Sequence, residues 1–119
     1  MNLKNKEYIP ERQDIVWIDF MPSKNQEIRG RHPAVVLSTS IYTRLTGLVV
    51  VAPITHANQN RLKDFFVSIN NFNLGIEGYV NPLQFFSFSV KGRHVEFSGD
   101  VLPDELYGEV QRRVIQIIS

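Results

Sequence analysis

Residues 48–55 read Leu-Val-Val-Val-Ala-Pro-Ile-Thr. Valine and isoleucine favour strands, and the run has no polar residue before its last position. A near-continuous apolar run of this length predicts a strand that is buried on both faces. We expect Pro53 to end this strand or to form a bulge in it, because proline cannot donate a hydrogen bond to a strand ladder. Thr55 then lies at the end of the strand.

Shorter strand patterns lie on both sides of this run. Residues 14–20 alternate as a strand requires, with Ile15, Trp17 and Asp19 on one face and Val16, Ile18 and Phe20 on the other. Further strands are predicted at residues 34–38, 64–69, 83–90 and 93–97. An irregular segment or one helical turn is expected at residues 41–45, and Gly47 follows it. The chain therefore consists mainly of short strands.

The last segment has the pattern of a helix. Pro103 suits the first helical position, and Asp104 and Glu105 suit the positive end of the helix dipole. Apolar residues then recur every three or four positions, at Leu106, Val110, Val114, Ile117 and Ile118. Five to six short strands and one closing amphipathic helix, without crossover helices, favour a small closed or half-closed antiparallel β-barrel. A two-layer sheet with one helix across it is the alternative.

Length and composition restrict the class of protein. The chain has 119 residues, 43% of them hydrophobic, which fits one domain; we expect a flexible arm at residues 1–7 and the domain at residues 8–119. No apolar run approaches the roughly 18 residues of a membrane span, and the first residues lack a signal core, so we expect a soluble, cytoplasmic protein. The absence of cysteine excludes disulfides, thiolate zinc sites and cysteine nucleophiles.

The charges are nearly balanced, but the cations are clustered. The chain contains 13 Lys and Arg and 12 Asp and Glu, which gives a formal charge of +1. The clusters are Arg29, Arg31 and His32; Arg61 and Lys63; and Lys91, Arg93 and His94. On charge alone, solvated loops explain these clusters better than a phosphate-binding track does.

The first cluster lies in a polar loop that leads directly into an apolar strand. Gly30 lets the backbone bend there, and Pro33 fixes where the strand begins. Nitrogen-rich side chains in a loop held by a rigid strand favour binding of an anion.

Several segments, in this order, resemble the PemK/MazF family of bacterial toxins. They are Tyr8-Ile9-Pro10, residues 14–22, residues 30–38, residues 51–55, Gln84, Lys91, Arg93 and the helix start at residues 102–106. The resemblance covers the whole chain. It implies an SH3-like barrel that forms a homodimer and cleaves single-stranded RNA at short sequences without a metal or other cofactor. It also implies inhibition by an antitoxin protein through a disordered segment, in a toxin-antitoxin hetero-oligomer.

The resemblance also implies a site. Metal-free cleavage uses the neighbouring 2′-hydroxyl of the RNA as nucleophile, so the protein supplies a base, an acid and donors to the phosphate. In relatives, a threonine at the strand end and an arginine directly before the loop proline fill the central roles. Thr55 matches the threonine, but His32 precedes Pro33 here and the arginine is Arg31.

This exchange leaves three alternatives open. Strand-like alternation would point Arg31 and His32 to opposite faces. The loop then adjusts so that Arg31 still reaches the phosphate, or His32 becomes the acid or base with Arg31 as its partner, or activity is reduced. We expect Arg31 and His32 to act together, since the pKa of histidine lies near neutrality.

Other residues are weaker candidates. Glu27 matches a loop carboxylate of relatives, where it would relay a proton or orient Arg31, and a solvated loop acid is an equal alternative. The RNA-binding candidates are Phe20, Arg29, His56, Gln84, Lys91 and Arg93. Phe20 fits the core equally well. The three histidines do not have metal-ligand spacing, so no metal site is predicted.

Two competing functions remain. The first is an SH3-like module that binds RNA or a peptide and cuts nothing. The presence of His32 before Pro33, where relatives have arginine, is consistent with this function. The second is a gyrase-inhibiting toxin on the same barrel; it ranks lower, because those toxins use an aromatic C-terminal tail and this chain ends Ile117-Ile118-Ser119.

Overall fold

The computed structural model describes residues 7–20, 30–56 and 61–119. Its elements are β1 (Asp14–Phe20), β2 (Gly30–Val36), α1 (Ser40–Thr46), β3 (Leu48–Thr55), the 3₁₀ turn η2 (Lys63–Phe65), β4 (Val67–Ser68), β5 (Tyr79–Val80), β6 (Phe86–Ser89), β7 (Glu96–Val101) and α2 (Asp104–Ile118). Of the expected N-terminal arm, only Glu7 belongs to the described residues.

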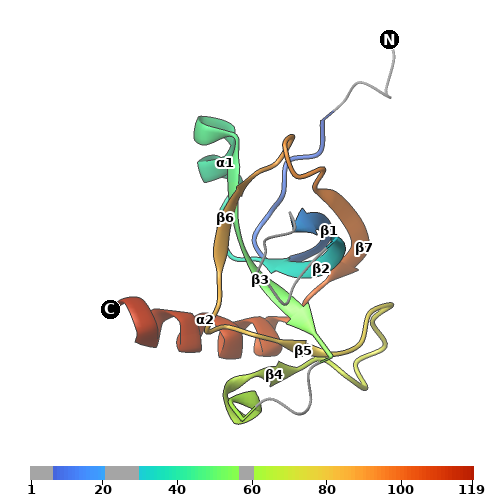
Figure 1. The fold of residues 1–119 in the computed structure, drawn as a ribbon, viewed down its shortest axis with the longest axis vertical. Coiled ribbons are helices and arrows are strands. Elements are labelled where there is room, and N and C mark those ends of the chain that lie inside the picture. Colours follow the sequence, from blue (N-terminus) through green and yellow to red (C-terminus); the bar gives the residue numbers. More distant parts are fainter. Residues whose placement is uncertain (1–6, 21–29, 57–60) are drawn as a thin grey trace.

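The strands form one curled antiparallel sheet, and α2 lies across it (Figure 1). The strand order is β4-β5-β3-β2-β1-β7, and β6 pairs with β3 in addition. The predicted mainly-β, barrel-like fold with a C-terminal helix is therefore confirmed. Neither helix in the described ranges has the length and apolar character needed to cross a membrane.

The apolar run of residues 48–55 is β3, the strand with the most partners. It pairs with β2, β5 and β6. Val49 and Val51 belong to one hydrophobic cluster and Ala52 and Ile54 to the other, so the prediction of a strand buried on both faces is confirmed. The expectation that Pro53 ends or bulges the strand is wrong, because β3 continues to Thr55 and its register with β2 shows no shift up to the Ala34–Pro53 pair.

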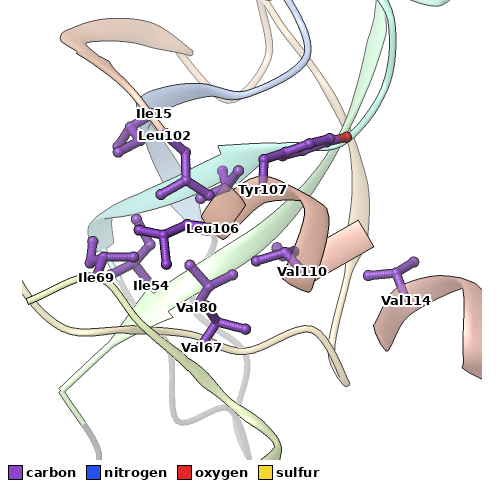
Figure 2. Packing of buried hydrophobic residues seen from close by; sticks show 12 residues of the cluster. Ile15, Ile54, Val67, Ile69, Val80, Leu102, Leu106, Tyr107, Val110 and Val114 are labelled. Atoms are coloured by element: carbon purple, nitrogen blue, oxygen red, sulfur yellow. The ribbon is translucent and has the colours of Figure 1, made fainter. Parts of the chain in front are cut away.

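Two hydrophobic clusters lie on opposite faces of the central strands. In the first, α2 packs against the sheet with Leu106, Tyr107, Val110 and Val114, as Figure 2 shows. The second fills the curl of the sheet and contains Val16, Ile18, Phe20, Ala34, Val36, Val49, Val51 and Val95. The alternation predicted for residues 14–20 fits this arrangement, since Ile15 joins the first cluster and Val16, Ile18 and Phe20 join the second.

Some predicted boundaries shift. β2 begins at Gly30 rather than at residue 34, because it pairs with β1 as far as Phe20. Of the strand predicted at residues 64–69, residues 64 and 65 belong to the η2 turn and only Val67–Ser68 form a strand, β4. The ranges of β6 and β7 also differ from their predicted ranges. The helical turn expected at residues 41–45 is α1, which ends at Gly47 with a φ of 77°, a value that favours glycine.

Candidate active site at the ends of three strands

Three neighbouring strands end or begin at the same edge of the fold. β1 ends at Phe20, β2 begins at Gly30 and β3 ends at Thr55, and they are antiparallel neighbours. Ala34 pairs with Pro53 in the β2–β3 register, and continuing this register sets His32 opposite Thr55. Residues that face each other on adjacent strands present their side chains on the same face of the sheet. The sequence order of β2 therefore brings His32, rather than Arg31, to the side of Thr55.

His32 is half-buried, at the edge of the cluster inside the curl. Its ring meets the Phe20 ring edge-on, with centroids 5.8 Å apart. Nδ1 is buried and has no hydrogen-bond partner among the described residues. Burial lowers the pKa of His32, the charge of His56 lowers it further, and the backbone of Pro33 and Ile54 acts in the opposite direction. The neutral imidazole is therefore favoured.

Arg31 faces the opposite side of the sheet. Its Nη1 donates to Oδ1 of Asp19 at 2.8 Å, and its Nη2 donates to Glu96 on β7. Nδ1 of His94 lies 2.9 Å from the second carboxylate oxygen of Asp19. The hydrogen bond from Arg31, and then the one with His94, lower the pKa of Asp19. The alternation of β2 thus separates Arg31 from His32, and two carboxylates hold the guanidinium.

Phe20, which contacts His32, belongs to a cluster of three phenylalanines. The Phe20 ring is edge-on to Phe86 at 5.4 Å and to Phe88 at 5.3 Å, while Phe86 and Phe88 stack with their centroids 5.3 Å apart. Phe20 is only 4% exposed, so it belongs to the core as well as to the edge of the site. The guanidinium of Arg93 lies 4.3 Å from the centroid of Phe88. An aromatic cluster with one cation on it therefore supports this edge.

The remaining candidates are spread more widely. Gln84 is half-buried between β5 and β6, and His56 is exposed directly after β3. Lys91 pairs with Glu7 at 3.0 Å and lines a pocket of about 720 Å³ with Leu48, at the other end of β3 from Thr55. Glu27 and Arg29 lie outside the described residues.

The Asp19, Glu96 and His94 contacts of this region were not found from the sequence. Asp19 is a polar residue within a strand pattern, which is a signal, but its partners follow only from the register between β1, β2 and β7. Within the described ranges, no three His, Cys, Asp or Glu side chains are grouped so that they could hold a metal ion.

Comparisons with known proteins agree with this architecture. Residues 11–118 match the family model of the PemK-like, MazF-like toxins of type II toxin-antitoxin systems. The chain is 33% identical over 99 residues to the endoribonuclease toxin MazF of Escherichia coli strain K12, which covers 83% of this chain and 86% of that one.

Solved structures of similar proteins have the same fold as this chain. The form I crystal structure of MazF from Deinococcus radiodurans has a TM-score of 0.82 and 28% identity, and covers 94% of this chain and 98% of that chain. A form III crystal structure of MazE-MazF from the same organism has a TM-score of 0.79 and 28% identity, with 93% and 97% covered. The prediction of an endoribonuclease toxin is confirmed at the level of the family. The chain belongs to the PemK-like, MazF-like toxin family of type II toxin-antitoxin systems.

Proposed function

We propose that this chain is a cytoplasmic endoribonuclease toxin that cleaves single-stranded RNA without a metal. The 2′-hydroxyl attacks the neighbouring phosphate, the bond to the 5′-oxygen breaks, and the products carry a 2′,3′-cyclic phosphate and a 5′-hydroxyl. The observation that carries this proposal is the β2–β3 register, which, continued beyond the Ala34–Pro53 pair, sets His32 opposite Thr55 at adjoining strand ends. A neutral imidazole and a hydroxyl at one place supply a proton acceptor and a hydrogen-bond donor to a phosphodiester.

In this proposal, residues of β2, of β3 and of the segment before β2 have separate roles. His32 takes the central catalytic role, and Thr55 donates a hydrogen bond to the oxygens on which charge develops. Arg31 acts as a positioning residue, since its ion pairs with Asp19 and Glu96 hold the start of β2 against β1 and β7. Glu27, which precedes β2 in the sequence, is proposed to orient the reacting groups.

The RNA strand is proposed to run over the edge that carries the aromatic cluster. Gln84 and His56 would contact bases or phosphates there, and Arg29 and Lys91 would bind the strand further along. Arg93 lies over Phe88 and also donates to the carbonyl of Asp19 at 3.4 Å, so its charge is held beside this edge. Phe20 would support a stacked base from the core side.

An RNA-binding module that does not cut is the second candidate. The observation in its favour is the position of Arg31, whose guanidinium is neutralised by two carboxylates on the face opposite to Thr55. A site without that cation has one donor fewer for the phosphate in the transition state.

One experiment separates these functions. The purified protein is incubated with a long single-stranded RNA of mixed sequence in EDTA, and the ends of all fragments are mapped. We expect discrete cuts with 2′,3′-cyclic phosphate and 5′-hydroxyl ends, and a strong loss of these cuts with Thr55→Ala. Retained RNA binding without any cut would support the module, and loss of cleavage in EDTA would contradict the metal-free reaction.

The proposed partners are a second copy of this chain and an antitoxin. A pocket of about 370 Å³ beside α2 is lined by Phe85, Ile115 and Ile118, and Ile115 and Ile118 are 47% and 65% exposed. An exposed apolar surface of this kind favours a homodimer. Relatives have been crystallised as MazE-MazF complexes, and we propose that a disordered antitoxin segment covers the cationic edge of this chain. Light scattering at micromolar concentration tests the dimer, and a monomer would contradict it.

A further inference from the structure

The end of β3 that carries Thr55 is attached to β5. β3 pairs with β2 at residues 51–53 and with β5 at Ile54 and Thr55 (Figure 1). The partner of Thr55 in this register is Tyr79, the first residue of β5. Because the last two residues of β3 pair with β5, a shift at the start of β5 moves the backbone that carries the Thr55 hydroxyl.

Gly78 directly precedes β5 and lies against the backbone of Thr55. It is buried, and its φ of 135° is one that favours glycine. A Cβ atom added to Gly78 would lie 2.7 Å from the carbonyl oxygen of Thr55 and 3.2 Å from Cγ2 of Ile54. A larger residue at this position must therefore displace the Thr55 carbonyl or the start of β5.

Asn70 holds Gly78 in this place. Its Oδ1 accepts a hydrogen bond from the amide of Gly78 at 2.8 Å, and the amide of Ile69 donates to the carbonyl of Gly78 at 3.0 Å. The Ile69 side chain is 1% exposed and belongs to the first hydrophobic cluster, so this anchor lies in the core. Without the Asn70 side chain, the amide of the buried Gly78 loses this acceptor, which is costly in a folded protein.

Given the role of Thr55 in the proposed function, on which this step rests, we propose that Gly78 and Asn70 are positioning residues for RNA cleavage. Gly78 leaves the space that the Thr55 carbonyl occupies, and Asn70 fixes Gly78 there. Together they set where the Thr55 hydroxyl meets the phosphate, and neither residue needs to touch the RNA. A misplacement of about 1 Å in an active site can lower a rate by about 10²-fold.

The first measurement compares kcat and KM for a short RNA that contains one mapped cut. Gly78→Ala should lower kcat by about 10²-fold and leave KM nearly unchanged, because the Thr55 hydroxyl is proposed to act on charge that develops in the transition state. Asn70→Ala should lower kcat in the same way. Asn70→Asp keeps the acceptor Oδ1 and should restore most of that loss.

Gly99→Ala is the matched control for backbone strain. Gly99 on β7 also has a positive φ, of 98°, but no atom of the described residues lies within 4 Å of a Cβ built there. Both alanine variants are therefore strained, and only Gly78→Ala collides with Thr55. Gly99→Ala should lose stability in urea unfolding but keep the wild-type kcat. All rates are measured at a temperature at which circular dichroism shows each variant to be folded.

The second measurement asks whether both residues act through the Thr55 hydroxyl. Gly78→Ala and Asn70→Ala are each combined with Thr55→Ala, and single-turnover rates are compared. Losses from independent effects multiply, whereas residues that act through one shared group are not additive. In the absence of the hydroxyl, each second substitution should therefore cost far less than it does in the wild type.

The third measurement does not depend on cleavage. The NMR resonances of the Thr55 methyl group report on the surroundings of its side chain. Gly78→Ala and Asn70→Ala should shift these resonances, and Gly99→Ala should leave them in place. Unshifted Thr55 resonances in both variants would overturn the positioning role.

The outcomes separate the two proposals. If the wild type makes no cut in EDTA, the proposed function fails, and the positioning role in cleavage fails with it. If Thr55→Ala loses activity but the variants at Gly78 and Asn70 keep kcat, or their losses multiply with that of Thr55→Ala, only the positioning role is wrong. If Gly78→Ala does not fold, the two Asn70 variants decide.

Discussion

The guanidinium of Arg31 and the carboxylate of Asp19 lie 2.8 Å apart across β1 and β2, on the face opposite to the one shared by His32 and Thr55. Glu96 and His94 complete this group on the β7 side. The order Arg-His before Pro33 decides which of the two side chains faces the site. A single exchange of neighbours in a strand turns each side chain to the other face.

Acid stability should depend on Asp19. Its pKa is lowered in the folded state, by Arg31 first and His94 second, so its contribution to the free energy of unfolding is complete above the unfolded pKa of about 3.9. This contribution is lost as pH falls below that value. Asp19→Asn should therefore flatten the dependence of stability on pH at the acid end, measured by urea unfolding. Glu77→Gln, at an exposed position, should leave that dependence as in the wild type.

Arg31→Ala separates a positioning role from a catalytic one. If Arg31 only holds the start of β2, the variant should be less stable and slower, but the shape of its pH–rate profile should not change. The measurement is the rate across the pH range together with thermal unfolding. Complete loss of cleavage in a variant that stays fully folded would instead return Arg31 to the catalytic centre.

Thr55 should be needed for its hydroxyl. Removing one donor to a developing oxyanion typically costs about 10²–10³-fold in rate, so we expect a loss of this order in Thr55→Ala. Thr55→Ser keeps the hydroxyl and should keep most of the activity. Circular dichroism controls for folding. Equal rates for the alanine and serine variants would remove the hydroxyl from the mechanism.

The buried position of His32 should make the protein sensitive to mild acid. Its folded pKa lies below the unfolded value of about 6.5, so the unfolded chain binds the proton more readily and stability falls as pH drops below that value. His32→Gln should reduce this slope between about pH 7 and pH 5. The check is the urea midpoint at each pH, and an unchanged slope would argue that His32 titrates normally in the fold.

Leucines on the two helices provide a test of the core. Leu106 on α2 is 8% exposed and packs on the sheet, whereas Leu45 on α1 is 80% exposed. We expect Leu106→Ala to cost about 2–5 kcal/mol in the free energy of unfolding, and Leu45→Ala to stay within about 0.5 kcal/mol of the wild type. Both are measured by chemical denaturation. Similar losses would mean that α1 is covered in solution, as in an oligomer.

Much of this fold could be predicted from local patterns. β1 and β3 have the predicted ranges because alternation and an unbroken apolar run are strong signals over seven or eight residues. The structure of residues 64–69 was harder to predict, because the strand pattern is short and the chain forms a 3₁₀ turn at Lys63–Phe65. Gly30 and Arg31 read as a loop because their strand character comes from pairing with β1, which a local pattern does not contain.

The site was predictable in part. Thr55 at a strand end follows from the sequence, and the alternation of Arg31 and His32 was foreseen as a geometric possibility. That Asp19 and Glu96 hold Arg31 was not, since these residues are 12 and 65 positions away from it and meet it only through the register of three strands. The roles of these side chains remain predictions.

β3 carries Thr55 and pairs with three other strands, with hydrophobic clusters on both of its faces. Amide protons in such a strand exchange with solvent only when the whole domain opens. Local unfolding of β3 is therefore a poor way to inhibit the site that contains Thr55. An inhibitor of this site must cover the end of β3 while leaving the strand folded.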